Sequence, residues 1–126
     1  MVTLEEYWRG YEKKFRPEFT EEIQKNGKHT VETVNKLLSV FGQDRQLTSG
    51  WRPVAVNKRT KGASKTSRHL TARAADIDDR DRVLTAFCLL NQDLLEELGL
   101  WMESPERTPR WVHVQTTEPP SKKRVF

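Results

Sequence analysis

The predicted feature that most limits how this chain can fold is one long amphipathic helix. Thr20 can cap its N-terminus, and Gly42 is a natural end because glycine commonly follows the last helical turn. Gly27 weakens its middle. Apolar residues recur between these ends at helical spacing and give the helix one apolar face: Ile23, Val31, Val34, Leu38 and Phe41. The 126 residues suit a single domain, so this face is expected to be buried in a core shared with the rest of the chain.

Shorter elements are predicted on both sides of this helix. A capping box at Thr3–Glu6 indicates a first helix that runs to about Gly10. After the long helix we expect, in order, a strand at Gln46–Gly50, a loop at Asn57–Ser67, a buried strand at Ala72–Ile77, a third helix that follows Asp78–Asp81 and ends at Gly99, two hairpin strands at Leu100–Glu103 and Arg110–Thr116, and an exposed tail from Pro119. The expected parts are therefore a helical N-terminal part (1–45), a part with the candidate site (46–116) and a tail (117–126).

Composition excludes several classes of protein. The single cysteine, Cys88, cannot form an internal disulfide, so folding in the cytoplasm is expected. No apolar run approaches the roughly 18 residues of a membrane span, and the polar, acidic segment Met1–Gly10 is no signal peptide. We therefore expect synthesis in the cytoplasm, no membrane insertion, and delivery by another agent if the target lies outside.

The net charge of +4 favours anionic partners such as nucleic acid or cell-wall polymer. Basic residues gather in Lys58–Arg73 and Lys122–Arg124, which could also be solvated loops. A small nucleic-acid-binding protein is one interpretation of the basic loop and the tryptophans. Because the chain contains no recognised nucleic-acid motif and the charge excess is small, we expect no nucleic-acid partner.

A first candidate metal-binding group lies in the sequence Ser67-Arg-His69-Leu-Thr-Ala-Arg-Ala-Ala-Asp76. His69 offers an imidazole nitrogen and Asp76 a carboxylate oxygen, both of which are good zinc ligands. The small residues between them would let the backbone approach closely. The alternative is a capping histidine and an unrelated surface acid.

The second candidate is His113, on the last predicted strand. Alternation places Trp111, His113 and Gln115 on one face of that strand. The alternative is a half-buried strand histidine beside a core tryptophan. Together the two groups supply two histidines and one aspartate, and a catalytic zinc uses three protein ligands and an open position for water.

A third candidate is Arg52, in Thr48-Ser-Gly-Trp-Arg52-Pro. An arginine where a strand ends at a turn can hold a substrate carboxylate through two hydrogen bonds. The alternative is a surface arginine stacked on Trp51.

These motifs in this order resemble the zinc D-alanyl-D-alanine metallopeptidases, which share a fold with the hedgehog signalling domain and the lysostaphin-type endopeptidases. The family signature is Ser-x-His-x-x-Gly-x-Ala-x-Asp followed by a late histidine on a strand. The chain keeps every signature residue except one, since Ala72 stands where the family has glycine, which matters if the position needs a positive φ. The resemblance runs from about Leu47 to Gln115 and implies an α+β fold, with a small, mostly antiparallel sheet and helices packed on one side. The predicted pattern agrees with that fold.

The resemblance also implies roles for single residues. His69, Asp76 and His113 match the ligands of one Zn²⁺ per chain. Arg52 matches the arginine that steadies the substrate carbonyl or carboxylate, and Ser67 matches a residue beside the substrate's terminal carboxylate. On the strand face that carries His113, Gln115 could contact the substrate.

The motifs leave two candidates for the general base. Many relatives carry an acid three residues before the last histidine, where this chain has Arg110, which cannot act as a base. The nearest acid is Glu103, on the preceding strand of the predicted hairpin, and Glu106 in the hairpin loop is the reserve candidate. The alternative is that Glu103 pairs with a neighbouring arginine and does no chemistry.

The expected function is zinc-dependent hydrolysis of a peptide bond in bacterial peptidoglycan by a monomer. Both a D-Ala-D-Ala carboxypeptidase and an endopeptidase fit. The chain is similar in style to small phage-encoded members of the group, so a lysin released through a membrane pore or a phage-particle component is the expected setting. A zinc domain of the same fold without catalysis, used to bind the wall or to build a phage particle, is the alternative.

Overall fold

The computed structural model describes residues 1–126 and contains one four-stranded antiparallel sheet with strand order β1-β2-β4-β3. The strands are β1 (Leu47–Ser49), β2 (Ala74–Asp78), β3 (Trp101–Met102) and β4 (Trp111–Gln115). The two central strands, β2 and β4, pair over their whole length. The predicted α+β class, with a small antiparallel sheet, is confirmed.

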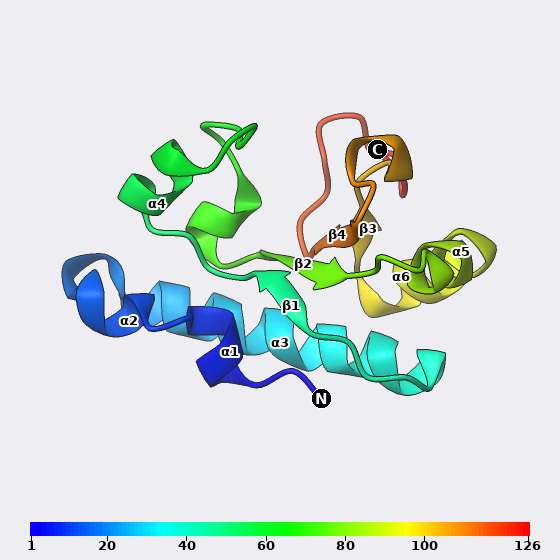
Figure 1. Ribbon diagram of the computed structural model, residues 1–126, viewed down its shortest axis with the longest axis horizontal. Helices are drawn as coiled ribbons and strands as arrows, with labels where there is room; N and C mark the ends of the chain where they lie inside the picture. Colours follow the sequence, from blue (N-terminus) through cyan, green and yellow to red (C-terminus); the bar gives the residue numbers. More distant parts are fainter.

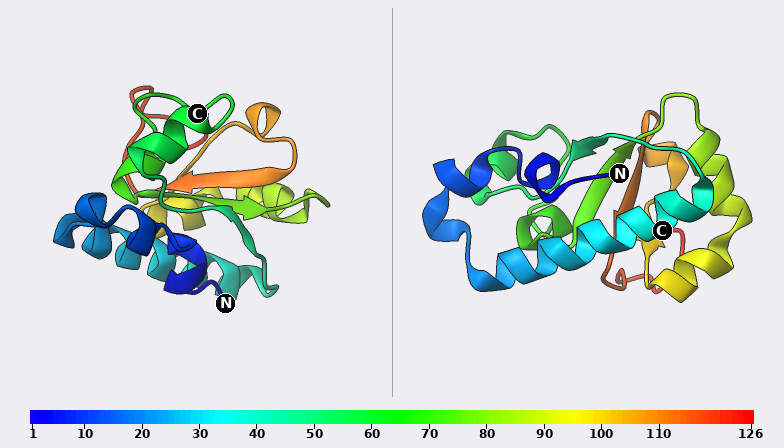
Figure 2. Two further views of the ribbon diagram at one scale, coloured as in Figure 1. Left: turned by 60° about the vertical axis from the view of Figure 1, so that its left-hand side comes forward. Right: turned by 90° about the horizontal axis from the view of Figure 1, so that it is seen from below.

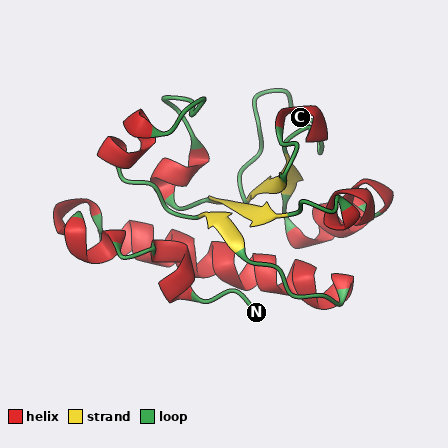
Figure 3. Ribbon diagram, in the orientation of Figure 1, coloured by secondary structure: helices red, strands yellow, loops and turns green.

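Helices occupy most of the remaining chain. They are α1 (Leu4–Trp8), α2 (Tyr11–Lys14), α3 (Glu21–Phe41), α4 (Val54–Arg59), α5 (Val83–Leu90) and α6 (Gln92–Leu98), with 3₁₀ turns η1 (Arg16–Glu18), η2 (Arg68–Thr71) and η3 (Pro105–Arg107). Figure 1 shows α1 and α3 beneath the sheet, and α4 with its loop on the opposite side. Figure 3 shows the strands held between these helical parts. None of the helices combines the length and the apolar character that crossing a membrane requires.

The long helix α3 forms as predicted. The hydroxyl of Thr20 accepts a hydrogen bond from the Ile23 amide at 3.2 Å, and Gly42 ends the helix with a φ of 85°. The helix lies under the sheet, as the view from below shows (Figure 2), and its apolar side chains belong to the buried core. The structure explains why residue 27 has no side chain, because a Cβ at Gly27 would lie 2.2 Å from the ring of Trp8. The glycine thus weakens the helix but admits an aromatic ring into the core.

The N-terminal helix α1 supports the loop that follows β1. Thr3 caps it as predicted, with a 3.1 Å hydrogen bond from the Glu6 amide. The Glu6 side chain does not complete the capping box and accepts a 2.7 Å hydrogen bond from the Leu47 amide. Tyr7 is fully buried. Its hydroxyl donates to the Ala74 carbonyl at 2.8 Å, and its backbone carbonyl accepts from the Trp51 amide at 3.2 Å. Helix α1 therefore joins β1, β2 and the residues just before Arg52.

Two predicted boundaries between the strands were wrong. The segment Asn57–Ser67 is not all loop, because its first residues belong to α4, where Val56 and Asn57 are buried. The predicted third helix is two helices, since the chain breaks at Asn91 between α5 and α6. The predicted start of this helical segment agrees with the structure. There the buried carboxylate of Asp79 accepts hydrogen bonds from the amides of Leu84 and Thr85, in the first turn of α5. A helical repeat alone does not reveal such a break.

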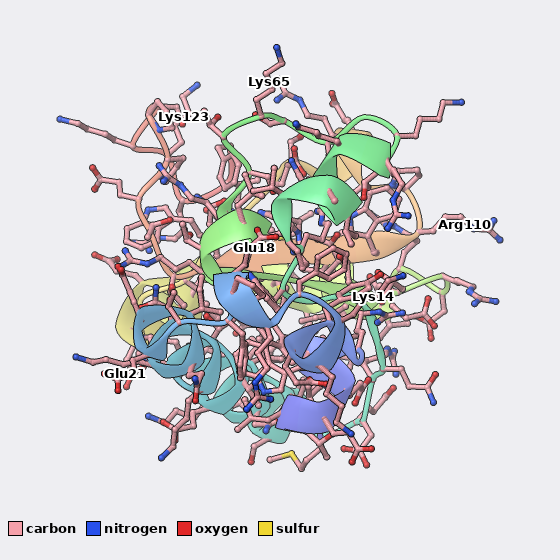
Figure 4. The ribbon with its side chains drawn as sticks, turned by 90° about the vertical axis from the view of Figure 1, so that its left-hand side faces the viewer. Lys14, Glu18, Glu21, Lys65, Arg110 and Lys123 are labelled. Carbon is pink, nitrogen blue, oxygen red and sulfur yellow. The ribbon has the colours of Figure 1, made fainter.

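The predicted exposed tail was also wrong in part. The strap, which we define as residues 116–126, returns to the edge of β3 and pairs with it in parallel, with Met102 opposite Val125. The Met102 amide donates to the Arg124 carbonyl and the Phe126 amide donates to the Met102 carbonyl, both at 2.9 Å. The Lys123 side chain still points into solvent (Figure 4). The strap thus covers an open sheet edge, which pattern reading could not anticipate because it forms no regular element of its own.

Candidate metal centre

Pairing of the two central strands creates the site. In the β2–β4 register Asp76 lies directly opposite His113, so their side chains emerge on the same face of the sheet. His69 reaches the same point from η2. Asp76 Oδ1 lies 2.8 Å from His113 Nδ1 and 3.2 Å from His69 Nε2. The three side chains are buried, and their ligand atoms all lie within 4.8 Å of one another.

The backbone of η2 gives His69 its position. The Ser67 hydroxyl caps this turn and accepts a 3.2 Å hydrogen bond from the His69 amide. The turn ends at Ala72, which has a φ of 58° and is fully buried. The position where the family has glycine therefore does need a positive φ, and alanine occupies it at some cost. The hydroxyl of Thr30, on α3, donates to the Ala72 carbonyl at 2.8 Å and holds this conformation.

Hydrogen bonds on the far side of each imidazole fix its tautomer. His69 Nδ1 lies 2.7 Å from the Gly50 carbonyl oxygen, which can only accept, so Nδ1 carries the proton and the Nε2 lone pair is free. His113 Nε2 lies 3.0 Å from Gln115 Oε1. The Gln115 amide group donates to the Thr117 carbonyl at 2.9 Å, which orients Oε1 towards the ring. His113 therefore turns Nδ1 inward, and the inner nitrogens of both rings point at Asp76.

The electrostatics of the cluster follow from burial and contact. Burial lowers the pKa of His69, so its imidazole is neutral at neutral pH. Burial acts in the same direction on His113, but its hydrogen bond to Asp76 and the charge of that carboxylate raise the pKa of His113 above its ordinary value. Burial opposes ionisation of Asp76, yet the two imidazoles hold the pKa of that carboxyl well below its usual range. A cation that binds here displaces a proton from His113, so its affinity falls as the pH falls.

This donor set fits a zinc ion. Two imidazole nitrogens and one ionised carboxylate converge on one point, and these are the ligand types that zinc prefers. The Gly50 carbonyl and the Gln115 side-chain oxygen hold the two rings in the orientation that turns those nitrogens inward. The ligands lie at the floor of an open cleft of about 1030 Å³. A metal ion held by these three side chains would face the cleft.

Arg52 lies beside the cluster with donors to spare. It is buried, and its Nη2 lies 3.9 Å from Asp76 Oδ2. Its Nη1 donates to Asn57 Oδ1 at 3.3 Å, whereas its buried Nε has no partner. Burial lowers the pKa of the Arg52 guanidinium, but an arginine stays charged. The Trp51 ring packs between Trp8 and Phe19, with centroids at 6.0 and 5.6 Å.

The sequence did not single out Asn57. Its side chain accepts from Arg52 and donates to the Ser64 carbonyl at 2.9 Å, so it ties the arginine to the loop after α4. Asn57 falls in a segment that the pattern assigned to a loop, and no motif there marks it as a partner of Arg52. Only the fold of α4 brings the two together.

The two candidate general bases, Glu103 and Glu106, differ in whether they line the cleft. The Glu103 amide donates to the His113 carbonyl at 3.0 Å, so Glu103 lies directly across from His113 where β3 ends. Its side chain lines the cleft, forms no ion pair, and its charge helps to raise the pKa of His113. Glu106 is exposed and does not line the cleft. Arg110 points away from the molecule (Figure 4) and does not pair with Glu103.

The cleft has two sides above His69, Asp76 and His113. One is formed by α4, its loop and η2, and the other by η3 and the strap, as Figure 1 shows above β2. The residues predicted to touch substrate, Ser67 and Gln115, both line this cleft. On the strap side the Phe126 ring lies 6.2 Å from the His113 ring. The structure thus gathers every predicted site residue except Glu106 around one cleft.

Comparison with known proteins agrees with this geometry. A family model described as Peptidase M15 matches residues 12–115. The chain belongs to the peptidase M15 family. Its members are zinc-dependent metallopeptidases, and this chain carries the buried histidine–aspartate–histidine group that such a peptidase requires. Neither a curated protein nor a solved structure matches the chain significantly.

Proposed function

We propose that this peptidase M15 chain hydrolyses peptide bonds in bacterial peptidoglycan, with one zinc ion held by His69, Asp76 and His113. The observation that carries the proposal is the convergence of two imidazole nitrogens on one carboxylate oxygen at the floor of an open cleft. Membership of the family supports a peptidase in general. The peptidoglycan substrate rests on the resemblance of the motifs to D-alanyl-D-alanine metallopeptidases.

The residues around the cluster divide the chemistry among them. Bound zinc would supply a Lewis acid that polarises a carbonyl and acidifies water. Arg52, whose guanidinium lines the cleft beside Asp76, donates to the carbonyl oxygen and stabilises the negative charge that develops there. Glu103 takes a proton from the attacking water and later gives it to the leaving amine. Its half-exposed carboxylate, free of ion pairs, is available for both transfers.

Two more residues line the path of the substrate. Ser67 caps η2 and lines the cleft. In a carboxypeptidase it would lie beside the terminal carboxylate of the substrate, and in an endopeptidase beside the chain that continues past the cut bond. Gln115 also opens onto the cleft, although its oxygen already accepts from His113. We therefore assign Gln115 first to holding the His113 ring and second to contact with the substrate.

The shape of the cleft favours cleavage inside a peptide. A carboxypeptidase needs a closed pocket around the last residue, whereas an endopeptidase needs a groove that accepts chain on both sides of the bond. The cleft is open and has a volume of about 1030 Å³, at the upper end of what small-ligand sites occupy. We propose an endopeptidase, in the setting of a phage lysin or a phage-particle component that the style of the sequence resembles.

The decisive experiment separates metal binding from catalysis. Purified protein should contain about one zinc per chain, and the His113→Ala variant should lose it. Glu103→Gln should keep the zinc and lose the release of peptide ends from purified peptidoglycan, while the matched Glu106→Gln control keeps both. Mass spectrometry of the released fragments identifies the bond. If the wild-type protein binds zinc but releases no fragment, the non-catalytic wall-binding alternative replaces this proposal.

A further inference from the structure

The wall of the cleft formed by α4, its loop and η2 carries an unusual charge. Residues 58–68 contain five basic side chains and no acid: Lys58, Arg59, Lys61, Lys65 and Arg68. Two of them, Lys61 and Arg68, line the cleft. Neither forms an ion pair or a side-chain hydrogen bond within the protein. Their positive charges are therefore free to meet a ligand.

The lining of the whole cleft also carries more basic than acidic side chains. Its basic lining side chains are Arg9, Arg52, Lys61, Arg68 and Arg107, and its only acidic side chains are Asp76 and Glu103. A divalent metal cation would offset both acids, so the basic residues would remain uncompensated. A cleft that carries one sign of charge between low-dielectric walls raises the local concentration of oppositely charged ligands. The ligand that suits this cleft is an anionic peptide.

We propose, on the basis of the proposed function, that the cleft selects peptides with free side-chain carboxylates and that Arg68 and Lys61 bind those carboxylates. Arg52 lies buried at the floor beside Asp76, within reach of the bond to be cut, and is not available for a carboxylate elsewhere on the peptide. Glu103 lines the opposite side and repels such a group. Carboxylates of the bound peptide therefore face Arg68, which directly precedes the ligand His69 in η2.

The experiment compares two peptides that differ only in charge. One is a cell-wall stem peptide with free side-chain carboxylates, and the other is the same peptide with each of those carboxylates converted to the primary amide. We expect kcat/KM for the acidic peptide to exceed that for the amidated peptide by about tenfold, as one or two charge-assisted hydrogen bonds would give. The preference should shrink at high ionic strength because salt screens half-exposed charges.

The variants test which residues cause the preference. The double variant Lys61→Gln/Arg68→Gln should lose most of the rate on the acidic peptide and little on the amidated one. Lys65→Gln is the matched control, because Lys65 belongs to the same loop but points into solvent and does not line the cleft (Figure 4). Zinc content should be unchanged in all of them. Equal preference in the double variant and the wild type, or none in the wild type, overturns the inference.

Failure of the proposed function remains distinguishable from failure of this inference. If neither peptide is cut, calorimetric titration of the same two peptides into the zinc-loaded protein gives their Kd values. A tighter Kd for the acidic peptide that disappears in the double variant supports the charged wall even without catalysis. Equal Kd values for the two peptides overturn it, whatever the enzyme does.

Discussion

Replacement of Gln115 by leucine tests whether the metal site depends on a residue that is not a ligand. Gln115 is buried, and its Oε1 lies 3.0 Å from His113 Nε2. Leucine has a similar volume but no acceptor, so the ring loses the partner that keeps the proton on Nε2. The neutral imidazole can then carry its proton on Nδ1 and donate it to Asp76 across the 2.8 Å contact. That is the nitrogen that a metal ion needs.

The size of the effect follows from that single hydrogen bond. Loss of a residue that orients a metal ligand costs about 10- to 100-fold in metal affinity, which corresponds to about 1.4–2.8 kcal/mol. We expect the lower half of that range for Gln115→Leu, because His69 keeps its own partner, the Gly50 carbonyl. Gln115→Glu is the matched control, since a carboxylate oxygen at the same place still accepts from Nε2–H.

The assay is competition for zinc against a chromophoric chelator at pH 7.5, with thermal unfolding of the metal-free proteins in parallel. Gln115→Leu should bind zinc about tenfold more weakly than the wild type, and Gln115→Glu at least as tightly as the wild type. If Gln115→Leu binds zinc as tightly as the wild type while its fold is intact, then the hydrogen bond does not set the tautomer of His113.

Two other predictions concern the support of the site. Gly50→Ala places a Cβ 2.2 Å from the Tyr7 carbonyl oxygen, so urea unfolding should show that the free energy of unfolding falls by about 3 kcal/mol. In the control Gly62→Ala the new Cβ meets no neighbour, and the free energy of unfolding should fall by only about 1 kcal/mol. Equal losses in the two variants would contradict the close contact at Gly50. Burial raises the pKa of the Cys88 thiol from 9.0 to about 12, and it also raises the pKa of Tyr7. The folded state then holds protons that the unfolded state releases, so stability is intact below pH 9.0 and falls as the pH rises from 9.0 to about 12. The slope is about 1.4 kcal/mol per pH unit for each group, and unfolding free energies that stay constant to pH 11 would refute it.

Local patterns predicted those elements whose signals lie in neighbouring residues. Thr20 and Gly42 bound α3 because capping and glycine termination act within one or two turns. The alternation on β4 placed His113 and Gln115 on one face, since side chains alternate along any strand. The break at Asn91 between two helices and the helical start of the Asn57–Ser67 segment were missed, because a helical repeat and a polar composition do not define such boundaries.

The sequence by itself determined which side chains could bind a metal ion, because imidazole and carboxylate are suitable ligands wherever the fold places them. Only the tertiary structure decided how they act together. The β2–β4 register set Asp76 opposite His113, and the chain before Arg52 supplied the carbonyl of Gly50 that fixes His69. It was also the pairing of β3 with β4 that put Glu103, and not Glu106, on the cleft. Such contacts join residues far apart in the chain, and their geometry depends on how the whole core packs rather than on any local pattern.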